Sequence, residues 1–234
     1  MNFEDRMMNY HTTTRRHPSR SRSLIQEHSV LRNTYLLLGL TLLFSALCTV
    51  LSVVFQIGHA NIFLHILCLY GLLFAVRATA HTGFGLLFTF LFTGYMGISL
   101  GPIVNMFLHN TINGTAIILN ATASTGLIFL GLSAYTLASG KNYSYLGGTL
   151  FMLLFAGIIL SLMSFFLGMP LLYLGVNALF ILVFSGLIMY HTSEIVHGGE
   201  TNYILATISL YLVIYNLFVH LLQIFAMLQN NDRN

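Results

Sequence analysis

The sequence predicts an all-α integral membrane protein, a bundle of seven transmembrane helices with the last helix central. Hydrophobic residues make up 56% of the 234-residue chain and charged residues only 6%, whereas a soluble domain carries about 25% charged residues. The apolar residues form several runs of about 20 residues, the length that a helix needs to cross the bilayer core. These runs are continuously apolar rather than alternating, which excludes a transmembrane β-barrel.

Most fixed positive charges lie in the N-terminal segment. Six of the nine basic residues are arginines within residues 1–32, and this polar segment is predicted to be a disordered basic cytoplasmic tail. It is not expected to be a cleaved signal peptide, because the apolar run after it is too long. Between Glu27 and Glu194 there is no acidic residue, and after Arg32 the only fixed positive charges there are Arg77 and Lys141. Because this membrane part offers no basic face, binding of nucleic acid is not expected.

The membrane domain is predicted over residues 33–228, and its first three spans at 35–55, 62–76 and 84–107. The third span carries Gly94, Gly97 and Gly101, of which the last two form a GxxxG pair. Small residues on one face let neighbouring helices approach closely, and this packing replaces the hydrophobic drive that lipid removes. Pro102 is expected to kink the third helix or to mark a discontinuity in it.

The remaining spans are predicted at 115–138, 145–167, 170–192 and 203–228, followed by a short polar C-terminal tail, residues 229–234. Pro170 suits the first turn of the sixth helix. Between the sixth and seventh spans, Gly198 and Gly199 permit backbone conformations closed to other residues, so they are predicted to form a hinge. The segment Glu200-Thr201-Asn202 is predicted to cap the seventh helix.

The distribution of Lys and Arg predicts the orientation of the chain. With the N-terminal tail in the cytoplasm, seven spans also place Arg77, Lys141 and the linker 193–201 on the cytoplasmic side. The opposite connections, at 56–61, 109–114 and 168–170, contain no Lys or Arg. The positive-inside rule therefore favours a cytoplasmic N-terminus and an external C-terminus.

The seventh span carries a polar stripe. Its members are Asn202, Ser209, Asn216 and Gln223, which repeat every seven residues, and His220 between the last two. Two helical turns take about seven residues, so these side chains share one face, which indicates a helix inside the bundle. The stripe either lines an ion or proton path or forms interhelical hydrogen bonds. The second role is commoner, and Asn105, Asn120, Asn177 and Ser185 are candidate partners.

Residues 191–197 contain the pattern HxxExxH at the cytoplasmic end of the sixth span. On a helix His191 and Glu194 share a face, but His197 points away, and zincins need two histidines four apart. No metal site is therefore predicted. His191 is a candidate protonation switch because histidine titrates near neutral pH, and a polar cap at the interface is the alternative interpretation. With no Ser-His-acid set, P-loop or paired membrane carboxylates, neither an enzyme nor a cofactor is predicted.

Three separated segments resemble the Bax inhibitor-1 family, also called the transmembrane Bax inhibitor motif family. They are FTGYMGISLGPIV (92–104), SYLGG (144–148) and HGGETNYILATISLYLVIYNLF (197–218). VLRNTYLLL (30–38) and HGGETNYI resemble its bacterial branch. The resemblance covers nearly all of residues 28–228 and implies a seven-helix bundle with the last helix central. It also implies an inner-membrane protein in the lipid bilayer, with a periplasmic C-terminus, that binds and modulates the membrane AAA protease FtsH. The N-terminal tail would be the part that the protease engages.

Other members of this family are pH-sensitive calcium leaks that use two acids. One acid follows the Tyr that ends the sixth helix, and the other lies within the LYLxxxNLF motif. This chain has His191 and Val213 there, and calcium prefers carboxylate oxygens. Arg77, near the basic cluster that some relatives carry after the second helix, consequently lacks its acidic partners. The alternative function is a calcium or proton leak with His191 as the switch.

Overall fold

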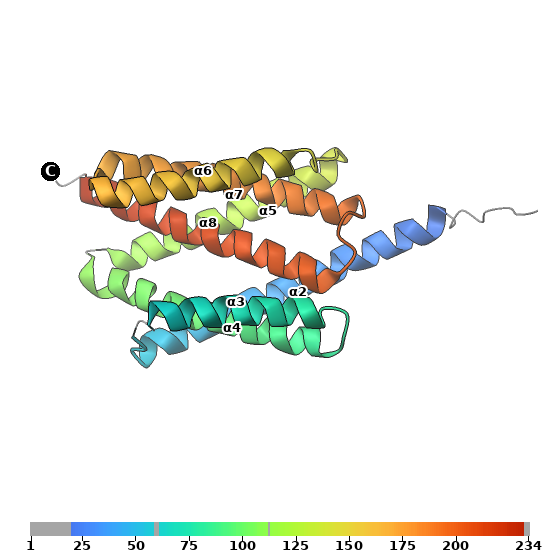
Figure 1. Ribbon diagram of the computed structural model, residues 1–234, viewed down its shortest axis with the longest axis horizontal. Coiled ribbons are helices and arrows are strands. Elements are labelled where there is room, and N and C mark those ends of the chain that lie inside the picture. The colour runs from blue at the N-terminus through green and yellow to red at the C-terminus, as the bar shows by residue number, and fades with distance from the viewer. Residues whose placement is uncertain (1–19, 59–60, 112, 232–234) are drawn as a thin grey trace, which may run out of the picture.

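The computed structural model describes residues 20–58, 61–111 and 113–231, and within these ranges the chain forms seven α-helices and no strand (Figure 1). All seven are long and apolar enough to cross a membrane. The helices are α2 (Arg20–Val54), α3 (Ile62–Thr79), α4 (Phe84–Asn110), α5 (Gly114–Ser139), α6 (Leu146–Leu167), α7 (Pro170–Val196) and α8 (Tyr203–Asn231). The predicted fold class is confirmed.

The last helix, α8, lies at the centre of the bundle. It contacts α2, α3, α4, α5 and α7, and 56% of the residues in its most apolar window are buried, more than in any other described helix. In contrast, among the described helices α6 packs only on α7, and α3 packs only on α4 and α8. Figure 1 shows α6 and α7 on one side of α8 and α3 and α4 on the other. The outer faces of α3 and α6 are therefore left to the lipid.

The first helix begins earlier than its apolar residues predict. Its membrane span begins at Ser29, but the helix itself begins at Arg20. The predicted disordered tail, residues 1–32, is therefore too long, because residues 20–34 contain no Gly or Pro that would stop a helix. At about 1.5 Å per residue, the part before Ser29 extends the helix by roughly 14 Å, and it projects from the bundle in Figure 1. Residues 1–19 lie outside the described ranges.

The other helices lie close to the predicted spans, and their ends differ by about one turn. The difference matters for α7, which continues to Val196. His191 and Glu194 therefore belong to the last turns of a regular helix, and the connection to α8 is short. The predicted C-terminal tail, residues 229–234, begins inside the last helix, since α8 extends to Asn231.

Helices α2 and α4 pack closely through the glycines of the third span. A Cβ atom at Gly97 would overlap the backbone carbonyl oxygen of Ser45 on α2, and one at Gly101 would overlap the Ser52 hydroxyl. Gly94 faces the same helix. These glycines place the two backbones at a distance that a larger side chain would prevent.

Pro102 does not interrupt α4, and the predicted discontinuity is absent. Proline has no N–H, so the carbonyl of Ile98, four residues earlier, loses its intrahelical donor. The Ser52 hydroxyl of α2 donates to this Ile98 oxygen at 2.9 Å. Thr49, which lies about one turn before Ser52 on α2, donates from its hydroxyl to the carbonyl oxygen of Gly97 at 2.9 Å. Helix α2 therefore supplies hydrogen bonds where the proline weakens α4.

Candidate functional site

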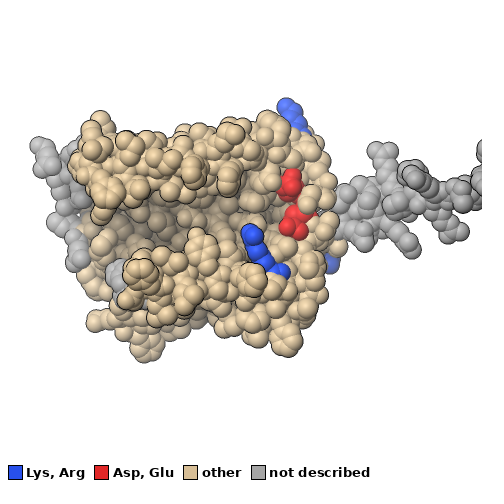
Figure 2. Space-filling model, in the orientation of Figure 1, with Lys and Arg blue, Asp and Glu red and all other residues tan. Residues whose placement is uncertain are grey.

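The described fixed charges of the bundle gather at one of its ends. Arg77 lies in the last turn of α3, Lys141 in the α5–α6 connection, Glu194 in the last turn of α7 and Glu200 in the α7–α8 linker. Figure 2 shows acidic and basic side chains together at this end, which is the end from which α2 projects in Figure 1. The sequence predicted this common side for Arg77, Lys141 and the linker.

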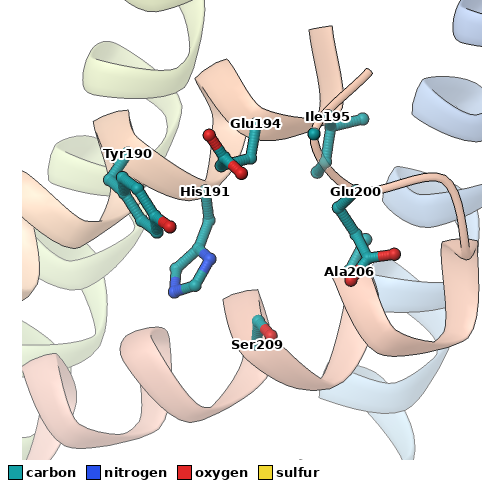
Figure 3. Close-up of a pocket in the computed structure, with 8 residues that line it drawn as sticks. Tyr190, His191, Glu194, Ile195, Glu200, Ala206 and Ser209 are labelled. Carbon is teal, nitrogen blue, oxygen red and sulfur yellow. The ribbon is translucent and has the colours of Figure 1, made fainter. Parts of the chain in front are cut away.

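A pocket of about 140 Å³ lies at this end, between α7 and the start of α8. Figure 3 shows the His191 ring directed from α7 toward Ser209 on α8, with the carboxylates of Glu194 and Glu200 on the neighbouring walls. The lining residues are Tyr190, His191, Glu194, Ile195, Gly199, Glu200, Ala206 and Ser209. His191 thus lies beside two carboxylates, although neither is at one of the two positions where the family resemblance implies an acid, which are His191 and Val213. Val213 is buried in the core.

Glu194 ties the α7–α8 linker to the α5–α6 connection. Its carboxylate accepts a hydrogen bond from the Ser144 hydroxyl. Its backbone carbonyl accepts from the N–H groups of Gly199, at 2.8 Å, and Glu200, at 3.1 Å. A Cβ atom at Gly199 would overlap the Glu194 carboxylate, and Gly198 has a φ of +72°, which favours glycine. The predicted hinge glycines therefore form a tight turn around Glu194, and a hinge motion there stays a prediction.

Ser193 forms a second tie between the same two connections. Its hydroxyl oxygen accepts from the N–H of Tyr143 at 2.8 Å and donates to Asn142 Oδ1 at 3.4 Å. His197 turns back onto this residue, with Nδ1 2.9 Å from the Ser193 carbonyl oxygen. His197 therefore bonds to Ser193 and is not among the residues that line the pocket with His191. Among the residues that the structure describes, no three His, Cys, Asp or Glu side chains are grouped to hold a metal ion.

Asn202 caps α8 and attaches it to a third connection. Its Oδ1 accepts from the N–H groups of Ile204, at 2.9 Å, and Leu205, at 3.3 Å, so the predicted cap is confirmed. Its Nδ2 donates to the carbonyl of Ala80 in the α3–α4 turn at 2.9 Å. The linker is thus bonded to the α5–α6 connection at one end and to the α3–α4 turn at the other. All three connections at this end of the bundle are held together.

The polar stripe of α8 lies on a half-buried face of that helix rather than its most buried one. Asn202, Ser209, Asn216, His220 and Gln223 are all half-buried. Side chains on other faces of α8, such as Tyr211, Leu217 and Leu222, are completely buried. Helix α8 is therefore central because of its apolar faces, and the stripe lies toward the edge of the core.

Two stripe residues form interhelical hydrogen bonds to α7. Nδ1 of His220 lies 2.8 Å from Oδ1 of Asn177, one of the partners expected from the sequence. The imidazole stacks on Phe180 with ring centroids 4.6 Å apart. The Tyr173 hydroxyl donates to Oε1 of Gln223 at 2.8 Å. At this end of α8 the stripe acts as polar contact between helices, the commoner of the two interpretations.

The middle of the stripe is bonded differently. Asn216 donates from Nδ2 to the carbonyl of Leu212 in its own helix at 2.7 Å, and Ser209 lines the pocket. Within the described part of the chain, neither side chain bonds to another helix. Asn105, another expected partner, has a buried Oδ1 that lacks a hydrogen bond in the same ranges.

Tyr211 is a central residue that the sequence patterns did not identify. Its side chain is only 1% exposed. The hydroxyl lies 2.7 Å from Oγ of Ser45 on α2 and donates to the carbonyl of Thr93 on α4 at 3.3 Å. A buried tyrosine in a membrane helix indicates that its hydroxyl is hydrogen-bonded, because unpaired polar groups are costly there. The sequence alone does not indicate which residue the hydroxyl bonds to.

Comparison with known proteins gives one family over most of the chain. The family model described as "Inhibitor of apoptosis-promoting Bax1" matches residues 27–231. The chain is 45% identical over 206 residues to "Modulator of FtsH protease YccA" of Escherichia coli strain K12, which covers 86% of this chain and 91% of that relative. "Inner membrane protein YccA" of E. coli O6:H1 gives the same figures. An "Uncharacterized membrane protein" of Vibrio cholerae serotype O1 is 42% identical over 209 residues, covering 89% and 93%.

Proposed function

The chain belongs to the Bax inhibitor-1 family, and from this premise we propose that it binds the membrane protease FtsH and modulates its activity. It is a multi-pass inner-membrane protein with seven spanning helices. The observation that carries the proposal is a sequence identity of 45% with a relative named as a modulator of this protease. This similarity extends over 86% of this chain and 91% of the relative. A stable bundle that the protease binds but degrades slowly would occupy the protease and restrain it.

The proposed role requires no catalysis by the protein itself. The relatives are named as a modulator or an inhibitor. At the charged end of the bundle, the Glu194 carboxylate is bonded to Ser144 and the Ser193 hydroxyl to Tyr143. Side chains used in this way hold connections together, which supports a role in presenting a surface rather than in transforming a substrate.

We expect FtsH to co-purify with the full-length protein from native membranes. Deletion of residues 2–19 should lengthen the half-life of the protein several-fold while FtsH still co-purifies. The reason is that a protease that extracts membrane proteins needs a free end to engage, whereas binding would use the helical bundle. The deletion stops before Arg20 and so preserves the whole of α2.

A control variant replaces residues 2–19 with a Gly/Ser segment of equal length, which should restore normal turnover. Recovery of no FtsH, together with unchanged turnover after the deletion, would refute the proposal. Half-life is measured by pulse-chase in cells with and without active FtsH.

The proposed orientation places the N-terminus in the cytoplasm and the C-terminus in the periplasm. It is supported by the positive-inside rule and by the gathering of fixed charges (Figure 2) at the end from which α2 projects (Figure 1). Single cysteines test it in a background without Cys48 and Cys68. A membrane-impermeant maleimide added to spheroplasts should label Met169→Cys, in the exposed α6–α7 turn, but label Lys141→Cys only after lysis. The opposite pattern would invert the orientation.

An ion leak with His191 as the switch has less support than modulation of FtsH. The pocket favours it, because His191 there lies beside Glu194, Glu200 and Ser209. The resemblance to calcium-leak members of the family gives this role little support, because His191 and Val213 stand at the two positions where those members have acids. Flux of calcium or protons in proteoliposomes decides the matter: a leak that is equal in wild type and His191→Ala removes this role for His191.

A further inference from the structure

Helix α8 has a half-buried face that runs along most of its length. Its residues are spaced three and four apart and are Leu205, Ser209, Leu212, Asn216, Val219 and Gln223, all of them half-buried. From the first to the last, the helix rises by roughly 27 Å, close to the hydrocarbon thickness of about 30 Å. A continuous face of alternating apolar and polar residues is therefore accessible through the depth of the membrane.

This face adjoins a hollow in the surface of the bundle. Helix α8 lies between α7 and α3 in Figure 1, and α3 packs mainly on α4 and touches α8 only slightly. Figure 2 shows the surface hollowed between the α6–α7 side and the α3–α4 side. Near one end of α8, the pocket lined by Ser209 lies at the charged end of the bundle. We call the hollow along α8 the α8 groove.

Two polar side chains of this face have hydrogen-bonding capacity that the described bundle does not use between helices. Asn216 donates only to its own helix, at the carbonyl of Leu212, and Ser209 bonds to no other described helix. Lipid chains offer no donors or acceptors, so covering these groups with lipid alone is costly. A polar or small side chain on a neighbouring helix satisfies such groups and permits close approach.

We propose that the α8 groove binds one transmembrane helix of FtsH, on a face of that helix with small or polar side chains at seven-residue intervals. This inference rests on the proposed function. Ser209, Asn216 and Gln223 are themselves seven residues apart, the spacing of helices that cross at a shallow left-handed angle. The incoming helix packs on Leu205, Leu212 and Val219 and pairs with the polar residues between them. Asn216 lies near the middle of α8, and its hydrogen-bonding groups at that depth favour a helix over a lipid as the occupant.

Photocrosslinking in native membranes tests the site with the full-length chain. A benzoylphenylalanine is placed at Leu212 in the α8 groove or, as a matched control, at Phe155 on the outer helix α6, where the native side chain is 61% exposed. Irradiation should give an FtsH adduct from position 212 and none from position 155. If FtsH co-purifies but position 212 gives only lipid adducts or none, the groove assignment is overturned and the proposed function stands. If FtsH does not co-purify with the wild type, both are overturned.

Two substitutions give an independent measurement. Leu212→Trp adds bulk to the groove and should lower recovery of FtsH by about fivefold or more, whereas Phe155→Trp should leave it unchanged. Asn216→Leu should lower recovery by about threefold, the size of one interhelical hydrogen bond in a membrane. Each variant is compared only if it elutes as a single species in detergent, which separates loss of binding from misfolding. Wild-type recovery by well-folded Leu212→Trp overturns the assignment.

Discussion

Replacing Gly97 with alanine is expected to destabilise the bundle by about 1–3 kcal/mol, the usual cost of adding atoms to a closely packed site. The added methyl group would overlap the carbonyl oxygen of Ser45, which belongs to the backbone of α2 and cannot rotate away. To accommodate it, α2 and α4 must separate. Separation would also lengthen the bonds from Thr49 and Ser52 to the carbonyls of α4. The expected result is a lower melting temperature and more aggregate on size-exclusion chromatography in detergent.

Gly131→Ala is the matched control for this prediction. A Cβ atom at Gly131 on α5 would have no atom within 4 Å, and alanine is favoured over glycine inside a helix by about 1 kcal/mol. This variant should be as stable as the wild type or slightly more stable. Equal melting temperatures for Gly97→Ala and Gly131→Ala would show that α2 and α4 can move apart without cost, against the packing described for these helices.

The number and placement of the spanning helices could be predicted from the sequence because each segment that crosses the bilayer must be a long apolar run. Every backbone polar group in hydrocarbon must be bonded internally, so each span is a long apolar helix. The same signal failed for the start of α2, because residues 20–28 are polar and composition does not distinguish a projecting helix from a disordered tail. The absence of Gly and Pro there was the better guide.

The direction of the α8 stripe could not be predicted from its spacing. Periodicity shows which side chains share a face, but not which neighbour that face meets. The stripe was interpreted as facing the interior, whereas Tyr211 and Leu217 occupy the most buried positions of the helix. The position of α8 at the centre follows from its contacts with five other helices, which depend on the whole chain.

The ties around the candidate site also lay beyond local patterns. The Glu194 carboxylate is bonded to a residue 50 positions earlier, and Asn202 to a backbone group 122 positions earlier. Only the capping of α8 by Asn202 could be predicted from the local sequence, because a cap acts within its own helix. Contacts between distant connections depend on how the helices are arranged, and a single sequence does not specify that directly.

Replacing Tyr211 with alanine is expected to destabilise the protein by about 3–5 kcal/mol, the usual cost of truncating a buried aromatic side chain. The ring is completely buried and packs edge-on against Phe92, with ring centroids 6.2 Å apart. Its hydroxyl joins α8 to Ser45 on α2 and to Thr93 on α4. The substitution removes both the packing and the polar bridge, so the three helices lose their common anchor. Thermal unfolding in detergent measures the loss.

Tyr211→Phe separates the two contributions, because it keeps the ring and removes only the hydroxyl. A buried partner left unbonded costs about 1–3 kcal/mol, so this variant should lie between the wild type and Tyr211→Ala. Tyr215→Phe, one turn later, removes a hydroxyl that bonds to no other residue in the described ranges, and it should leave the melting temperature unchanged. If Tyr211→Phe were as unstable as Tyr211→Ala, the hydroxyl bridge rather than the ring would hold α8 against α2 and α4. If it matched Tyr215→Phe, packing alone would do so.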